Sequence, residues 1–76
     1  ALTPKEFDLL SCLVRNAGRV VTYRQLLKEA WGPAYANQKQ YLRVYMVQLR
    51  RKLEADPTRP RFLMTEPGVG YRFRGE

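Results

Sequence analysis

The sequence predicts an α+β fold in which three helices precede a C-terminal β-hairpin. Two observations support this prediction. Three segments place apolar residues at helical spacing between helix start and stop signals. Two short β-prone runs near the C-terminus flank a turn that contains two glycines. A chain of 76 residues is the size of one small domain, so we expect a single hydrophobic core.

The first helix is expected over residues 4–16. Thr3 and Glu6 have the spacing of a capping box, in which each side chain accepts a hydrogen bond from the backbone N–H of the other residue. Pro4 suits the first helical position, and Gly18 follows the last turn as a stop signal. The apolar stripe expected to face the core consists of Phe7, Leu10, Leu13, Val14 and Ala17.

The second helix is expected to be short. Residues 19–21 form a β-prone link, and Thr22 with Gln25 then has the spacing of a second capping box. Pro33 cannot continue an α-helix, so residues 33–37 are expected to form a loop. The apolar stripe of this helix consists of Leu26, Leu27, Ala30 and Trp31.

The third helix is expected over residues 38–54, followed by an irregular connection. Residues 61–66 form a plausible strand. Residues 67–70 form a turn in which both glycines permit positive φ. Aromatic and basic residues alternate over residues 71–74, which is typical of a half-buried strand. These two strands complete the predicted hairpin.

The charge of the chain is strongly basic and unevenly distributed. The formal net charge is +7, from 14 lysines and arginines against 7 acidic residues, and the pI is near 10.1. The window of residues 37–54 alone carries +4. Such an excess is typical of nucleic-acid binding, although an anionic membrane or an acidic protein would also attract it.

The third helix has two different faces. Advancing 100° per residue places an apolar line toward the core, formed by Leu42, Tyr45, Met46, Leu49 and Leu53. The opposite face gathers Gln40, Arg43, Val44, Val47, Arg50 and Arg51, with Lys39 and Gln48 at its margins. An α-helix fits the major groove, where Arg reads guanine, Gln reads adenine and an apolar group meets the thymine methyl. Alternatively, either valine packs under a loop or the hairpin.

Further contacts are expected around this helix. A short helix, a loop and a longer basic helix form a helix-turn-helix variant, in which the N-terminus of the second helix, at residues 22–24, faces a phosphate. Trp31 either donates its indole N–H to another phosphate or belongs to the core. Arg72 is expected near the hairpin tip, where it enters the minor groove or remains a surface arginine. Tyr71 and Phe73 are expected to face the core.

Other classes of function fit the composition less well. The chain has no histidine and one cysteine, so we expect no structural zinc, no other cofactor and no catalysis. Cys12 is expected to be a small core residue. No secretory segment or long apolar span is present, which predicts a cytoplasmic protein that does not cross a membrane. RNA binding would need exposed aromatics for stacking. Docking onto an acidic protein remains the alternative function.

Four segments carry a resemblance to a known family. LTPKEFDLL, VVTYRQLLKEAWG, LRVYMVQLRRKLE and TEPGVGYRF together cover almost the whole chain. With them the sequence resembles the winged-helix effector domain of OmpR/PhoB-type response regulators. WGP, YLRVYM and DPTRPRF resemble the members that regulate potassium-uptake operons. The resemblance implies a winged helix-turn-helix that binds specific double-stranded DNA as a transcriptional regulator of a two-component system. Residues 38–54 then lie in the major groove and the hairpin wing lies in the minor groove.

The resemblance also implies roles for individual residues. Base contacts fall on Arg43, Val44, Val47, Gln48 and Arg50. Phosphate contacts fall on Arg24, Trp31, Tyr41 and Arg51, and Arg72 falls on the wing arginine that relatives insert into the minor groove. Tyr45 lies where some relatives carry a polar or basic reader, whereas helical periodicity places it at the core edge. Its role stays open.

Parts of the family pattern are not matched by these 76 residues. The family's N-terminal four-stranded sheet is missing, and so is a receiver domain with a phosphorylatable aspartate. We therefore expect the chain to be the effector part of a two-domain response regulator. Its cognate sensor kinase would act on the receiver domain, and the full-length protein would bind DNA as a homodimer. Residues 32–38 match the family's transactivation loop, which contacts RNA polymerase in some members.

Overall fold

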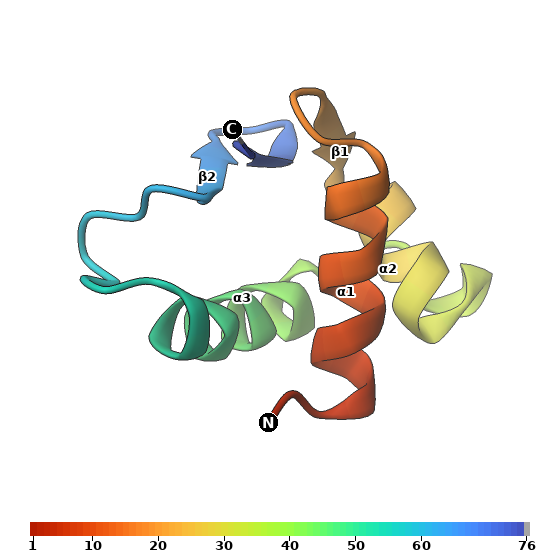
Figure 1. Ribbon diagram of the computed structural model, residues 1–76. Helices are drawn as coiled ribbons and strands as arrows, with labels where there is room; N and C mark the ends of the chain where they lie inside the picture. Colours follow the sequence, from red (N-terminus) through yellow and green to blue (C-terminus); the bar gives the residue numbers. More distant parts are fainter. Residues whose placement is uncertain (76) are drawn as a thin grey trace.

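The computed structural model describes residues 1–75 and contains three α-helices and a small antiparallel sheet (Figure 1). The helices lie on one side of the molecule and the strands gather at the other. This arrangement confirms the predicted fold class. The elements in chain order are α1 (Pro4–Arg15), β1 (Val20–Thr22), α2 (Tyr23–Trp31), the 3-10 helix η1 (Pro33–Tyr35), α3 (Lys39–Leu53), β2 (Leu63–Glu66) and β3 (Gly70–Phe73).

The sheet has three strands in the order β1-β3-β2, rather than the two strands of the predicted hairpin. The β-prone link after α1 is itself a strand, with Val21 paired antiparallel to Tyr71. On the other side of β3, Leu63 pairs with Phe73. The sequence identified the β-propensity of the link but not its partner, because that partner lies some 50 residues further along the chain. β3 is therefore the central strand, and β2 is an edge strand.

The two glycines of the wing turn serve different purposes. Gly68 has φ of 77°, a conformation that a residue without a Cβ adopts readily. Gly70 does not use positive φ, contrary to expectation. Instead, a Cβ at Gly70 would lie 1.9 Å from the carbonyl oxygen of Val21, so a glycine is needed for β1 to approach β3. The turn thus depends on one glycine for its shape and on the other for packing.

Side-chain caps begin two of the helices. At α1 the capping box is complete: Glu6 N–H donates to Thr3 Oγ1 at 3.3 Å and Thr3 N–H donates to Glu6 Oε1 at 2.9 Å. At α2 the Gln25 N–H donates to Thr22 Oγ1 at 3.1 Å. The reciprocal bond, from the Thr22 N–H to the Gln25 side chain, is absent among residues 1–75, so only half of the second predicted box forms.

One core joins the three α-helices and the three strands. It contains Leu9, Cys12, Leu13, Val21, Leu26, Leu27, Ala30, Leu42, Met46, Leu49, Leu63 and Tyr71, all of them buried. The stripe predicted for α1 is displaced from the observed one. Phe7 and Val14 are 60% and 46% exposed, whereas Leu9 and Cys12 are buried. This helix has apolar residues on two sides, and periodicity alone could not select the inner one. Within residues 1–75 no helix is both long and apolar enough to cross a membrane.

Candidate nucleic-acid interface

α3 is held to the domain by one face and leaves the other open. Leu42, Met46 and Leu49 are fully buried, while Tyr45 is half-buried at the edge of the core. Leu53, which was predicted to belong to the buried line, lies at the surface because the helix ends there. The inner face therefore runs for about two turns and fixes the direction in which the other residues point.

The two valines lie on the open face. Val44 is 54% exposed and Val47 is 43% exposed, so neither packs under a loop or the hairpin. This exposure excludes the packing alternative for the free domain. Arg43, Gln48 and Arg51 are also exposed. Hydrogen-bond donors and methyl groups are thus interspersed on one helical surface, the combination that the base edges of a major groove can use.

A groove of about 470 Å³ separates this helix from the wing. Its walls come from α2, α3, β2, β3 and the wing turn, and its lining residues are Tyr23, Lys39, Arg43, Val47, Arg50, Thr65, Gly68 and Tyr71. The structure thus brings three of the predicted base-contacting residues to one hollow. Lys39, which the sequence placed only at the margin of the open face, also lines it, with its ammonium group 5.1 Å from the centre of the Tyr23 ring.

Arg50 lines the groove but is bound within the domain. Its Nε and Nη2 donate to the Leu63 carbonyl oxygen at 3.1 and 2.9 Å, and Nη2 also donates to Thr65 Oγ1 at 2.6 Å. The guanidinium lies over the Tyr71 ring, 5.7 Å from its centre. Within residues 1–75 no hydrogen bond involves its Nη1. Arg50 therefore connects α3 to the wing, and Nη1 is the nitrogen left for another partner.

Arg72 lies within β3 and not near the hairpin tip, where it was expected. Residues 67–69 form the turn, closed by a hydrogen bond from the Val69 N–H to the Glu66 carbonyl oxygen at 3.0 Å. Arg72 is paired with Met64 and is half-buried. Its Nε donates to Glu66 Oε2 at 2.9 Å. Glu66 thus holds the Nε of this arginine, while among the hydrogen bonds of residues 1–75 none involves its Nη1 or Nη2.

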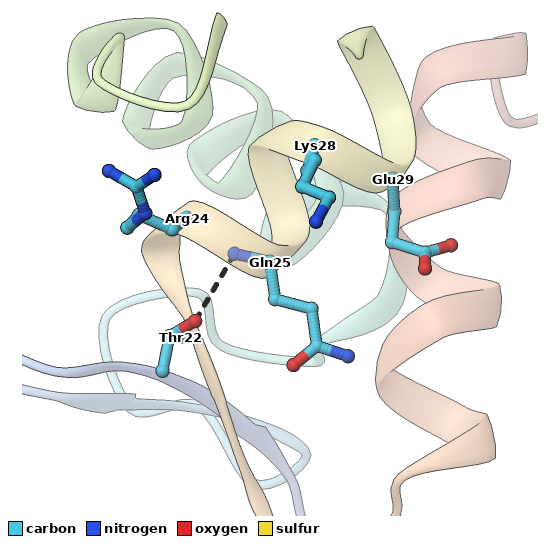
Figure 2. A pocket seen from close by; sticks show the side chains of 5 residues that line it. All are labelled: Thr22, Arg24, Gln25, Lys28 and Glu29. Atoms are coloured by element: carbon cyan, nitrogen blue, oxygen red, sulfur yellow. Dashed lines mark hydrogen bonds between the residues drawn. The ribbon is translucent and has the colours of Figure 1, made fainter. Parts of the chain in front are cut away.

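The N-terminus of α2 forms a shallow hollow lined by Thr22, Arg24, Gln25, Lys28 and Glu29 (Figure 2). One backbone donor that was expected to be free for a phosphate is already used, and the next is capped by Thr22 as the capping box predicts. The Tyr23 N–H donates to the Val69 carbonyl oxygen at 3.2 Å, and the Gln25 N–H donates to Thr22. Arg24 is exposed, and its Nη1 donates to Asn37 Oδ1 at 3.4 Å. The Arg24 side chain therefore supplies positive charge here.

An aromatic cluster borders the start of α3. Trp31 packs edge-on against Tyr45 with ring centres 5.1 Å apart, and its ring centre lies 6.3 Å from that of Tyr41. Trp31 is half-buried and packs against the core, whereas Tyr41 remains exposed. Trp31 therefore belongs to the edge of the core, where it supports α3, and its contact with a phosphate stays a prediction.

Two carboxylates are removed from the surface. A hydrogen bond of 2.6 Å from Lys52 Nζ, together with the Thr3 N–H, holds the pKa of Glu6 below its ordinary value despite burial. Burial would raise the pKa of Glu54, but three backbone N–H groups and the nearby Arg50 together lower it. Both groups stay ionised although they are buried, Glu6 against Lys52 and Glu54 against backbone amides.

Few side chains among residues 1–75 suit catalysis or metal binding. Burial raises the pKa of the Cys12 thiol, which disfavours the reactive thiolate. In the part of the chain from residue 1 to 75, no three Cys, Asp or Glu side chains gather into a potential metal site. Cys12 is a core residue, as predicted.

Comparisons with known proteins agree with this geometry. The model of the family described as "Transcriptional regulatory protein, C terminal" matches residues 1–73. The chain is 60% identical to the transcriptional regulatory protein KdpE of Mycobacterium tuberculosis, over 95% of the chain and 32% of that protein. It is 58% identical to the KDP operon transcriptional regulatory protein KdpE of Escherichia coli, again over 95% of the chain and 32% of the relative. The chain thus spans about a third of the length of these relatives.

Among solved structures, the fold is similar to the RstA DNA-binding domain of Klebsiella pneumoniae in complex with the RstA box. The TM-score is 0.86 and the identity is 32%, over 97% of this chain and 73% of that one. The similarity covers both the helices and the wing, so the groove between α3 and the wing lies in a shared part of the fold.

Proposed function

The chain belongs to the family of C-terminal domains of transcriptional regulatory proteins, and from this premise we propose that it binds specific double-stranded DNA. The observation that carries the proposal is the open face of α3, where Val44 and Val47 lie exposed among arginines and glutamine. A surface that only attracted anions would need no valines, whereas base edges offer both acceptors and methyl groups. The RstA structure, a DNA-binding domain with its box, supports the same function for a similar fold.

In this proposal α3 lies in the major groove. Its 15 residues make a rod of about 22 Å at 1.5 Å per residue, long enough to follow a groove about 12 Å wide. Arg43 and Gln48 are the bidentate readers, and Val44 and Val47 meet thymine methyls. Arg50 has Nη1 alone to offer a base, because its other donors hold the wing. We therefore assign it one base contact at most.

The phosphates on either side of the groove complete the footprint. Arg24 and Arg51 are exposed cations on α2 and α3, and Tyr41 is exposed at the start of α3. Trp31 lies next to Tyr41 and supports it. Each cation that neutralises a phosphate releases counterions and makes binding depend on salt. The wing then brings Arg72, which is paired with Glu66, to the neighbouring minor groove.

The regulatory setting is proposed from the longer relatives. Because the E. coli relative is a regulator of the KDP operon, we assign this domain to the control of potassium-uptake genes. Its complete protein would carry a receiver domain on which a sensor kinase acts, and would bind DNA as a homodimer. The proposed place of action is the cytoplasm, where the DNA is.

A second contact, with RNA polymerase, is proposed for residues 32–38. This segment contains η1, which projects Tyr35 with 41% of its surface exposed. It lies after α2 and before α3, so a partner bound there would sit beside a DNA-bound α3. A variant with Tyr35→Ala should keep its affinity for DNA and lose transcriptional activation in a reconstituted system. Loss of DNA affinity in this variant would contradict the assignment.

Selection of bound sites from random duplexes, followed by competition, tests the main proposal. The selected duplex should bind at least about 10³-fold more tightly than random DNA at the same salt concentration. Salt dependence alone does not suffice, because an acidic protein partner would also bind less tightly in salt. Equal affinity for selected and random duplexes would leave docking onto an acidic partner as the function.

A further inference from the structure

A buried carboxylate holds the chain as it returns from α3 to the wing. Residues 55–62 contain no helix or strand, and only at their end does a bond from the residue after β3 reach them, where the Arg74 N–H donates to the Phe62 carbonyl oxygen at 2.7 Å. Glu54, at the end of α3, is buried and accepts three successive backbone N–H groups. Arg61 donates to Oε1 at 2.8 Å, and Phe62 and Leu63 donate to Oε2 at 3.0 and 2.8 Å. The irregular segment is thereby closed onto the helix that precedes it.

Arg50, one turn earlier on α3, binds the carbonyl group that follows the last of these three amides. Glu54 accepts from the N–H of Leu63, and Arg50 donates to the carbonyl oxygen of the same residue. The Leu63 side chain is fully buried in the core. The first residue of β2 is therefore fixed to α3 through both of its backbone polar groups and through its side chain.

This attachment matters because β2 is an edge strand. β3 is its only neighbour in the sheet, and β3 in turn pairs with β1. The far end of the hairpin is tied to α2 by the Tyr23 N–H, which donates to the Val69 carbonyl oxygen. At the near end, the Gly18 N–H donates to the Phe73 carbonyl oxygen at 2.9 Å and ties β3 to the loop after α1. Among the hydrogen bonds of residues 1–75, those of Glu54 and Arg50 join the start of β2 to α3, so these two side chains contribute to the angle between the wing and α3.

A carboxylate suits this position and an amide does not. An ionised carboxylate presents two acceptor oxygens with room for about four hydrogen bonds, and charge shortens and strengthens them. A glutamine of the same shape would turn an NH₂ group toward at least one backbone donor. The three amides and Arg50 also hold the pKa of Glu54 below its ordinary value, so the group is charged when the domain is folded.

We propose that Glu54 is a positioning residue of the DNA interface, which sets the wing at the angle from which α3 and the wing reach one duplex together. This inference rests on the proposed function, because it assumes that both elements contact DNA. Glu54 itself is buried and touches no nucleotide. The competing interpretation is that Glu54 only adds stability, with no particular effect on the wing.

A first measurement needs no DNA. Amide hydrogen exchange of the Glu54→Gln variant should be at least about tenfold faster for residues 63–66 than in the parent chain, while the amides of α1 and α2 keep their rates. Faster exchange throughout the domain would mean a general loss of stability and would overturn the inference. The Glu54→Asp variant keeps the charge but is one methylene too short to reach all three amides. If Glu54→Gln does not fold, Glu54→Asp should still show faster exchange at residues 63–66, with a smaller increase in rate.

The second measurement is a double-mutant cycle with the wing arginine, on the selected duplex. Glu54→Gln should weaken binding about tenfold in the parent chain and by less than about twofold in an Arg72→Ala background, because the wing contact is then already lost. Removing an acid makes the domain more cationic, so a charge effect alone would tighten binding. Asp8→Asn, an exposed residue on α1, makes the same change of charge and should not weaken binding.

The outcomes separate the two proposals. Equal losses from Glu54→Gln in both backgrounds would overturn the inference and leave the proposed function intact. If Arg72→Ala binds like the parent chain, the wing makes no contact through Arg72. The proposed function would then lose its wing contact, and the inference about Glu54 would be overturned. A parent chain that shows no preference for any duplex would overturn the proposed function, while hydrogen exchange would still decide whether Glu54 holds β2.

Discussion

Arg43 and Arg50 are the same type of residue on the same helix, but they do different things. They lie seven residues apart, so their side chains leave α3 in nearly the same direction. Arg43 is exposed at the groove, whereas Arg50 donates three hydrogen bonds to the first strand of the wing. The first half of α3 therefore presents its arginine to a partner, and the second half uses its arginine to hold the domain together. The role of each arginine depends on what lies beside it, and β2 lies beside Arg50.

The largest effect is expected from the inner face of α3. Leu49→Ala should lower the free energy of unfolding by about 2–5 kcal/mol, because it opens a cavity at a fully buried position. Urea denaturation measures the change. Val47→Ala, two residues earlier on the open face, is the matched control and should change stability by less than about 0.5 kcal/mol. A large loss from the control would mean that Val47 belongs to the core after all.

The two arginines should separate in the next experiment. Arg43→Ala should weaken binding to the selected duplex by about 1–3 kcal/mol and relax specificity at one base pair, with little change in stability. Arg50→Ala should lower the free energy of unfolding by about 1–3 kcal/mol, because the Leu63 carbonyl loses its donors. Binding by titration and unfolding by urea should be measured on both variants. A destabilising Arg43→Ala with a neutral Arg50→Ala would reverse the assignment.

Signals from neighbouring residues predicted most of the fold. They failed for features that depend on residues far apart in the chain. The capping box at Thr3 and the stop at Pro33 need only neighbouring residues, and the start of α1 and the end of α2 were both predicted from them. The pairing of β1 with β3 depends on residues far apart in the chain. The side of α1 that faces the core depends on which neighbours cover it. Phe7 and Leu9 are equally apolar, so periodicity could not choose between them.

The candidate site was predictable in outline for the same reason. Exposure of Val44 and Val47 follows from their position on a helix whose opposite side is rich in leucine. The ion pair of Arg72 with Glu66 follows from hairpin register, which depends on where the turn begins. The three hydrogen bonds that Glu54 accepts depend on how the irregular segment 55–62 folds back onto α3. Their signal in the sequence was a lone acid ending a basic helix.

The exposed cations outside the groove should have a smaller and less selective effect. Arg51→Ala or Arg24→Ala should weaken binding to every duplex by about 1 kcal/mol at 0.15 M salt, because one neutralised phosphate contributes about 0.9 to the salt slope. The slope of log affinity against log salt should fall by about one for each variant. Titrations on selected and random duplexes at several salt concentrations measure it. A loss confined to the selected duplex would make these residues base readers.

The smallest effect expected is also the most specific, and it concerns Val44. If one of its two methyl groups meets a thymine methyl, Val44→Ala should weaken binding by about 0.8 kcal/mol, the value of one buried methylene. Replacing that thymine by deoxyuridine removes the methyl from the other side of the contact and should weaken the parent chain similarly. The two changes should not add when combined, because each alone abolishes the contact. Stability should stay within about 0.5 kcal/mol, since Val44 is exposed. Fully additive losses would show that Val44 and the thymine methyl do not meet, and base reading would then rest on Arg43, Val47, Gln48 and Arg50.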